Sequence, residues 1–154
     1  MLLNVLLGLF IIGITVVIQA QGTNFWFHKF MFAQGNLSAS QFKKRRVRML
    51  IMTSFFLISL HLMQASIWAI VYLLIPGIDE FQSFEKAIYF SLITFTTLGY
   101  GEITIGSSHR LLAGLEAING IMLIGWSTAF MFFVYQEIMR IQGAFDKNGS
   151  GKAN

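Results

Sequence analysis

The chain has 154 residues, of which 55% are hydrophobic and only 12% are charged, and it contains no Cys. Soluble domains carry about twice that share of charge, and one of this length could not bury 16 Phe and 8 Met together with its other apolar side chains. The composition therefore predicts a membrane protein, and the absence of Cys excludes disulfides and thiolate metal sites. The net charge of +4 is concentrated beside apolar stretches, so it is a poor signal for nucleic-acid binding.

The first predicted element is a transmembrane helix within residues 1–20. Residues 2–19 form an apolar stretch that is about long enough to cross a hydrocarbon core. A cleaved signal peptide is the alternative, and it is the weaker one because no Lys or Arg precedes the apolar stretch. We therefore expect an anchored N-terminal helix.

Residues 21–47 are expected to form a cytoplasmic linker that is first aromatic and then basic. Residues 25–32 read Phe-Trp-Phe-His-Lys-Phe-Met-Phe, which is typical of a segment lying along the inner membrane interface. A continuation of the first helix explains the same pattern equally well. The basic cluster that follows anchors the topology and is an expected contact for anionic lipid: Lys43, Lys44, Arg45, Arg46 and Arg48.

Residues 48–141 are expected to form one domain from an outer helix (48–75), a short helix (83–95) and an inner helix (111–141). The short amphipathic helix would be roughly 20 Å long, which is too little to cross a bilayer but suits a helix that enters and returns. The inner helix, at roughly 45 Å, would cross with tilt and project into water. The expected fold class is therefore an all-α membrane protein with three transmembrane helices and one re-entrant helix, followed by a flexible cytoplasmic tail over 142–154.

The charges of the connecting segments predict the orientation of the spans. Basic residues dominate between the first and second spans and after the third, whereas acidic residues outnumber basic ones from Pro76 to Arg110. Segments rich in Lys and Arg stay in the cytoplasm. We therefore expect a multi-pass protein of the plasma or cytoplasmic membrane with its N-terminus outside and its C-terminus in the cytoplasm.

Between the short helix and the inner helix, residues 96–102 read Thr-Thr-Leu-Gly-Tyr-Gly-Glu. This string resembles the selectivity filter of the tetrameric potassium channel family, in which Thr-x-Gly-Tyr-Gly is followed by an acid. Over residues 48–140 the order of elements is similar to the pore unit of bacterial members, here preceded by one extra transmembrane helix. The resemblance implies a homotetramer that conducts K⁺ passively, has no cofactor besides the K⁺ ions in its filter, and is not an enzyme.

The resemblance assigns K⁺ coordination to Thr97, Leu98, Gly99, Tyr100 and Gly101. An ion that enters a narrow pore loses its hydration water, and rings of backbone carbonyls from four chains can replace that water. Successive carbonyls point to the same side only if the backbone twist alternates. The two Gly residues adopt a positive φ at little cost because they lack Cβ.

Several residues are expected to support this filter. Thr96 matches the Thr that precedes the filter in the family, and Glu102 takes the place of the usual Asp. Tyr89 is expected to bond this acid where family members often have a Trp pair, whereas its neighbour Phe90 has no donor. Glu116 is polar within an apolar helix, near its outer end, and is a further candidate for support of the filter.

Gly120 and Gly125 are the expected hinge positions of the inner helix, with close helix packing as the alternative role. The departures from the family pattern leave a second function open, that of a weakly selective monovalent cation (Na⁺/K⁺) channel. Leu98 replaces the commoner Val, and Glu102 is one methylene longer than Asp.

Overall fold

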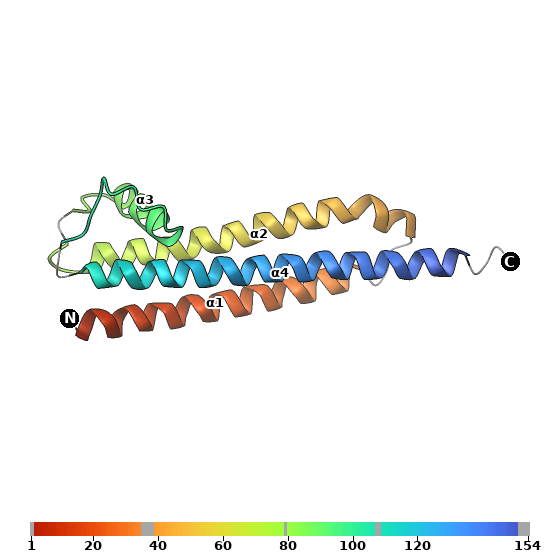
Figure 1. Ribbon diagram of the computed structural model, residues 1–154, viewed down its shortest axis with the longest axis horizontal. Coiled ribbons are helices and arrows are strands. Elements are labelled where there is room, and N and C mark those ends of the chain that lie inside the picture. Colours follow the sequence, from red (N-terminus) through yellow and green to blue (C-terminus); the bar gives the residue numbers. More distant parts are fainter. Residues whose placement is uncertain (1, 35–38, 79, 107–108, 151–154) are drawn as a thin grey trace.

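The computed structural model describes residues 2–34, 39–78, 80–106 and 109–150, with the side chains of 30–34, 39–44 and 145–150 left out. These residues form four helices: α1 (Leu2–Gln34), α2 (Ala39–Leu74), α3 (Phe84–Phe95) and α4 (Arg110–Ser150). The three long helices lie side by side, with α2 antiparallel to α1 and α4, and the short α3 packs at one end of the bundle (Figure 1).

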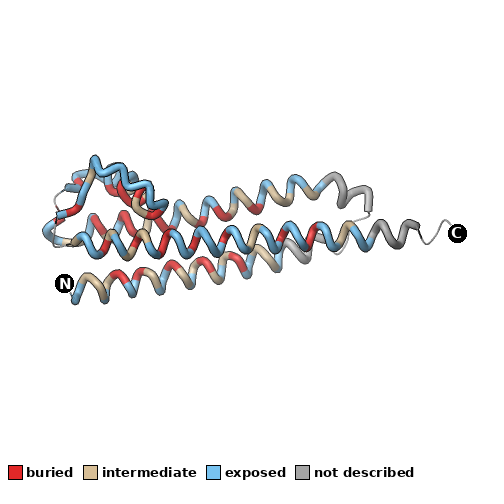
Figure 2. The backbone as a smooth tube through the Cα atoms, in the orientation of Figure 1, coloured by how far each residue is buried: buried red, intermediate tan, exposed pale blue. Residues whose placement is uncertain are grey.

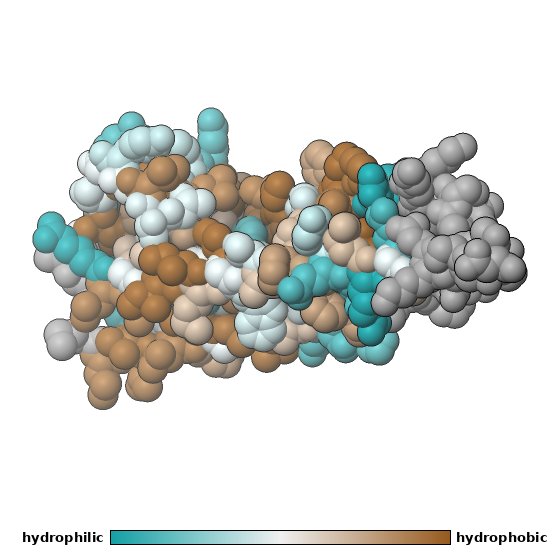
Figure 3. Space-filling model, turned by 45° about the vertical axis from the view of Figure 1, so that its right-hand side comes forward, coloured by the Kyte–Doolittle hydropathy of each residue, from teal (hydrophilic) through white to brown (hydrophobic). Residues whose placement is uncertain are grey.

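Each long helix contains a stretch that is long and apolar enough to cross a membrane: Leu2–Lys29, Arg45–Leu74 and Arg110–Ala144. Exposed and buried residues alternate along these helices (Figure 2), and the exposed ones include large apolar side chains such as Leu6, Leu9 and Phe10. Apolar side chains also cover much of the face drawn in Figure 3. The prediction of an all-α membrane protein is confirmed.

The segment that was expected to be an aromatic linker is part of α1. The helix continues through residues 25–32 because this stretch contains neither Pro nor Gly. Its indole side chain packs on α2: Trp26 donates a hydrogen bond to the Thr53 hydroxyl at 2.9 Å and stacks on Phe56 with ring centroids 4.4 Å apart. The aromatic block thus extends the first helix, which is the alternative to an interfacial segment.

The other two long helices also extend beyond their expected ends. The second begins at Ala39 instead of 48, and the fourth continues to Ser150 instead of ending at 141, so much of the expected linker and of the expected flexible tail is helical. Lys, Arg and Gln have high helix propensity, and neither extension contains Pro. The change from apolar to polar residues therefore indicated where these helices leave the apolar region, but it did not indicate where the helices end.

The short helix has the bounds that its local sequence predicts. Ser83 caps its N-terminus by accepting a hydrogen bond from the Lys86 N–H at 3.3 Å. The preceding helix α2 ends at Leu74, because the residue before Pro76 is disfavoured in the helical conformation. Gly77 then turns the chain with a φ of 88°.

The core of the molecule lies where α3 packs against α2 and α4. Three aromatic rings meet there, with centroid distances of 5.4 Å between Tyr72 and Phe90, 5.7 Å between Tyr72 and Phe81, and 5.1 Å between Phe81 and Phe90. Trp68 and Leu112 are fully buried in the same cluster. The α1 helix lies against α4 and α2, away from α3 (Figure 1).

Gly8 marks a close approach of α1 to α4, and it allows a test of which chain α1 packs on. A Cβ built at Gly8 would lie 3.4 Å from the Leu115 Cβ and 2.5 Å from its Cδ1. The pair Gly8→Cys and Leu115→Cys removes that Cδ1 and brings the two Cβ atoms near the usual disulfide separation of about 3.5–4.5 Å. We expect mild oxidation to give an intrachain disulfide, detected as the corresponding mass loss of the monomer.

The chain has no Cys of its own, so each single variant is a matched control that stays unlinked within its chain. Covalent dimers or larger species of the double variant on a non-reducing gel would instead mean that α1 packs on a neighbouring chain.

Candidate functional site

In the segment after α3 the backbone φ angle alternates between positive and negative values. Thr97, Gly99 and Gly101 have φ angles of 61°, 49° and 82°, whereas Leu98 and Tyr100 have negative φ. Thr97 is the one residue other than Gly with a positive φ in the described part of the chain. This conformation is unfavourable for a β-branched residue, so the surrounding structure has to impose it. Alternation of this kind points successive carbonyl groups to the same side.

The same segment is tied back to the end of α3 through its N–H groups. The Thr97 N–H donates to the Thr94 carbonyl at 2.9 Å, and the Gly99 N–H donates to the Ile93 carbonyl at 3.1 Å. Both bonds use carbonyl groups of the helix and leave those of residues 97 and 99 unused. The helix end therefore holds the segment in place while carbonyl oxygens of the segment stay available for a ligand.

In the single chain this segment is open on one side. Residues 96–102 are all exposed, and the large side chains of Leu98 and Tyr100 leave 60% and 68% of their surface uncovered. A single chain therefore covers only a small part of the Tyr100 side chain. Neighbouring exposed aliphatic and aromatic side chains of this size are typical of a surface that lipid or another protein covers.

At the C-terminal end of the segment, the structure brings together the two residues that were expected to bond there. The Tyr89 hydroxyl donates a hydrogen bond to the Glu102 carboxylate. This bond raises the pKa of Tyr89, because loss of the phenol proton would break it and place two negative charges side by side. Phe90 lies buried in the aromatic cluster and makes no such bond. Thr96, which follows the last residue of α3, donates a hydrogen bond from its hydroxyl to the Leu92 carbonyl at 2.7 Å.

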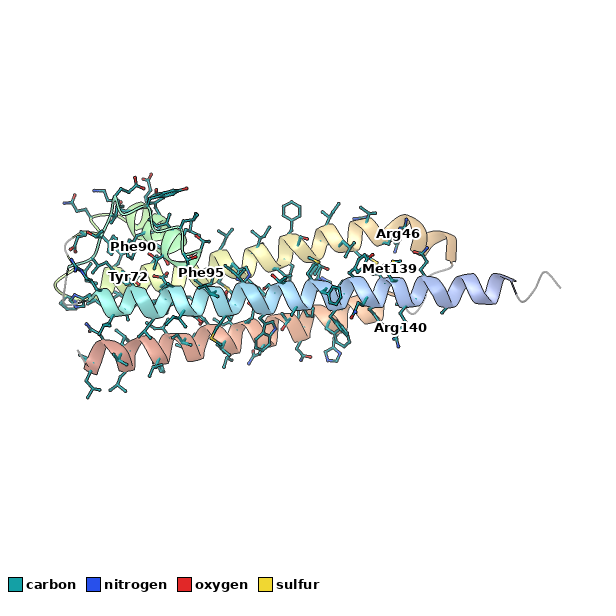
Figure 4. The ribbon with its side chains drawn as sticks, viewed as in Figure 1. Arg46, Tyr72, Phe90, Phe95, Met139 and Arg140 are labelled. Atoms are coloured by element: carbon teal, nitrogen blue, oxygen red, sulfur yellow. The ribbon has the colours of Figure 1, made fainter. Side chains whose placement is uncertain are left out.

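Glu116 lies behind α3 and is completely buried. Its carboxyl group accepts a hydrogen bond from the Tyr72 hydroxyl at 2.6 Å and also contacts the Ser91 hydroxyl, so one side chain of α4 is joined to α2 and to α3. Figure 4 shows Tyr72 of α2 next to Phe90 of α3. Tyr72 and Ser91 are the partners that sequence reasoning missed, because nothing local to them indicated a carboxyl partner on another helix.

The contacts of Ser91 favour a protonated carboxyl group at Glu116. The Ser91 hydroxyl lies 2.7 Å from the Ala65 carbonyl oxygen as well as next to the Glu116 carboxyl oxygen. A hydroxyl has a single hydrogen to donate, and a carbonyl oxygen has none. The hydroxyl hydrogen is therefore shared between the two acceptors, or the Glu116 carboxyl group is protonated and donates to Ser91 while Ser91 donates to Ala65, and the second arrangement gives each contact its own hydrogen. A neutral acid also avoids the cost of an unpaired charge in the protein interior.

The two expected hinge glycines differ in their surroundings. A Cβ built at Gly120 would lie 1.9 Å from the Phe95 carbonyl oxygen, whereas a Cβ built at Gly125 would meet no atom within 4 Å. Gly120 therefore lets the last turn of α3, marked by Phe95 in Figure 4, lie directly against the backbone of α4. Close helix packing was the alternative role for both residues, and Gly120 has such a contact, although its partner Phe95 was not predicted. A hinge role for Gly120 or Gly125 stays a prediction.

Only part of the basic cluster is exposed. Arg46 donates a hydrogen bond to the Gln142 side chain at 2.8 Å and so joins α2 to α4 (Figure 4). Arg45 and Arg48 are exposed at the same end of the bundle. The side chains of Lys43 and Lys44 lie outside the described residues. Of the expected lipid contact the structure therefore describes Arg45, Arg46 and Arg48, and it leaves Arg45 and Arg48 exposed.

Comparison with known proteins gives one match. A family model described as an ion channel matches residues 49–137, which is more than half of the chain. The match covers most of α2, all of α3, the alternating segment and α4 as far as Glu137, and it leaves out α1. No curated protein matches the chain, and no solved structure matches it.

Proposed function

The chain belongs to the ion channel family, and on this premise we propose that it is a passive potassium-selective channel whose pore is a homotetramer. The observation that carries the proposal is the alternation of φ at Thr97, Gly99 and Gly101 within the string Thr-Leu-Gly-Tyr-Gly. Four copies of such a strand around one axis form stacked rings of carbonyl oxygens, which replace the hydration shell of K⁺. The carbonyls of residues 97–101 are the proposed ligands, and K⁺ is the one bound ion proposed.

The exposed filter segment supports a tetramer. One chain contributes one strand, so it supplies a quarter of each carbonyl ring. The uncovered side chains of Leu98 and Tyr100 give each strand an apolar surface, and neighbouring copies would cover it. Symmetric closure around an axis also leaves no unpaired interface, as is usual for homo-oligomers.

The orientation of α3 supports cation conduction. Its C-terminus points toward the middle of the bundle (Figure 1), and the C-terminus of a helix carries a partial negative charge. In a tetramer, four such helix ends would be directed at the point where the ion leaves the filter. They would stabilise a cation inside the membrane, where water is scarce.

The proposed topology places the N-terminus outside and the C-terminus in the cytoplasm of the plasma or cytoplasmic membrane. The N-terminus and the filter segment lie at one end of the bundle, and the C-terminus lies at the other (Figure 1). Arg45 and Arg48 are exposed at the C-terminal end, which favours the cytoplasmic side for that end. They are also the proposed contact for anionic lipid head groups.

The test of the proposed function is the reversal potential of the purified protein in a planar bilayer with K⁺ on one side and Na⁺ on the other. We expect a value near the K⁺ equilibrium potential, and we expect Gly99→Ala to abolish it. A Cβ at Gly99 would meet no atom within 4 Å, but the φ of 49° is unfavourable for Ala. Loss of selectivity in this variant therefore reports on the backbone conformation.

Gly13→Ala is the matched control, because a Cβ there also meets no atom within 4 Å and the residue has an ordinary helical φ. It should conduct as the unchanged protein does. A reversal potential near zero with current present would replace the proposal by the second function, a weakly selective Na⁺/K⁺ channel. Leu98 and the single Tyr89–Glu102 bond would then be the first candidates for the cause of the weak selectivity.

A further inference from the structure

The N-terminal helix buries polar side chains in a membrane-length stretch. Thr15, Gln19 and Thr23 are spaced four residues apart, so they share one face of α1. Thr15 and Gln19 have no exposed surface at all. A lipid-facing anchor needs no such residues, and polar groups buried in a membrane protein are costly unless they are bonded.

Thr15 and Gln19 bond α4 at two places. The Asn119 amide donates to the Thr15 hydroxyl at 2.9 Å, and the Gln19 amide donates to the Ser127 hydroxyl at 2.9 Å. Gln19 also accepts a hydrogen bond from the Gln64 amide of α2 at 2.9 Å, so the three long helices are joined at this level. All five side chains are buried.

The two bonds lie on opposite sides of Gly125 in the sequence of α4. The half of α4 before Gly125 has further restraints, since Gly120 lies against Phe95 and Glu116 is bonded to α2 and α3. Just past Gly125, Ser127 makes the polar contact with α1. The bond to Asn119 therefore restrains a part of α4 that α3 also holds. The bond to Ser127 lies just past Gly125, and the other restraints on that half lie further along the helix, at Phe133 against Phe27, at the buried Val134 and Ile138, and at the bond between Arg46 and Gln142.

We propose that α1 acts as a splint, by which we mean a helix that restrains the inner helix α4 against bending. The Gln19–Ser127 bond opposes bending of α4 at Gly125 and so shifts the equilibrium between the open and the closed pore. The proposal rests on the proposed channel function, and it gives the extra helix a role in regulating the same pore. Hydrocarbon offers no water to replace the lost bond, so bending has to break it without compensation.

The experiment compares Ser127→Ala with Thr15→Val as a matched control in single-channel recordings of the reconstituted full chain. Side-chain hydrogen bonds in membrane proteins change an equilibrium by about threefold on average. We expect Ser127→Ala to change the ratio of open to closed time by about 3-fold if subunits move singly and up to about 80-fold if four move together. Its reversal potential should not change.

Thr15→Val removes the bond on the other side of Gly125 with almost no change of shape, and we expect a change of less than about 2-fold, because the other contacts of that half of α4 remain. An unchanged open probability in Ser127→Ala, or equal changes of open probability in the two variants, would overturn the splint proposal.

A second readout does not depend on conduction. Amide hydrogen exchange in the reconstituted protein should become faster in peptides covering residues 126–138 in Ser127→Ala, and it should stay unchanged there in Thr15→Val. This separates the two possible failures. Absence of current in every variant would contradict the channel proposal, whereas equal exchange rates in the unchanged protein and Ser127→Ala would contradict the splint. A folding defect in either variant would show as faster exchange throughout α4.

Discussion

Gly120→Ala is expected to abolish selective conduction, because the added methyl group has no space. Its carbon would lie 1.9 Å from the Phe95 carbonyl oxygen and 2.7 Å from the carbonyl carbon, and these are backbone atoms that cannot rotate away. Either α3 or α4 must shift, at a cost of about 1–3 kcal/mol or more for overpacking. A shift of α3 moves the point from which the filter segment starts. We expect selective current in a planar bilayer to fall by more than about 100-fold.

Gly125→Ala is the matched control for this prediction. It adds the same methyl group five residues further along the same helix, where a Cβ meets no atom within 4 Å. We expect this variant to assemble normally by size-exclusion chromatography and to keep the reversal potential of the unchanged protein, while its open probability shifts. Normal selectivity in Gly120→Ala would show that α3 and α4 do not lie in backbone contact.

Glu116→Ala is expected to have the second large effect. It removes the group that joins α4 to Tyr72 and Ser91 and leaves a cavity behind α3. A buried donor left without a partner costs about 1–3 kcal/mol, and a cavity of this kind adds a cost of similar size. We expect a clear drop in the thermal unfolding midpoint of the detergent-solubilised protein, together with loss of K⁺ selectivity.

Glu116→Gln separates a neutral acid from an ionised one. A Gln side chain can donate to Ser91 with its amide and accept from Tyr72 with its carbonyl, as the protonated carboxyl group does. We therefore expect Glu116→Gln to keep the unfolding midpoint and the reversal potential close to those of the unchanged protein. If Glu116→Gln lost selectivity as fully as Glu116→Ala, the negative charge itself would be required, and the neutral acid inferred from the contacts of Ser91 would be wrong.

The sequence by itself determined the class of the protein and the features that depend on neighbouring residues. A high apolar content with few charges demands lipid as a solvent, and this is independent of how the helices pack. Ser83 and Pro76 act through local backbone chemistry, and they account for the start of α3 and the end of α2. The spacing of Gly99 and Gly101 likewise predicted positive φ angles, although it did not predict that Thr97 would share them.

Only the tertiary structure decided how these elements work together. The partners of Glu116, the contact of Gly120 with Phe95, and the bonds of Thr15 and Gln19 join residues that are far apart in the chain. An isolated polar residue or glycine in an apolar helix has the same local signature whether it bends the helix, packs it or bonds a neighbour. Which of these it does depends on the side chain that another helix places opposite, and that placement is set by the packing of the whole bundle.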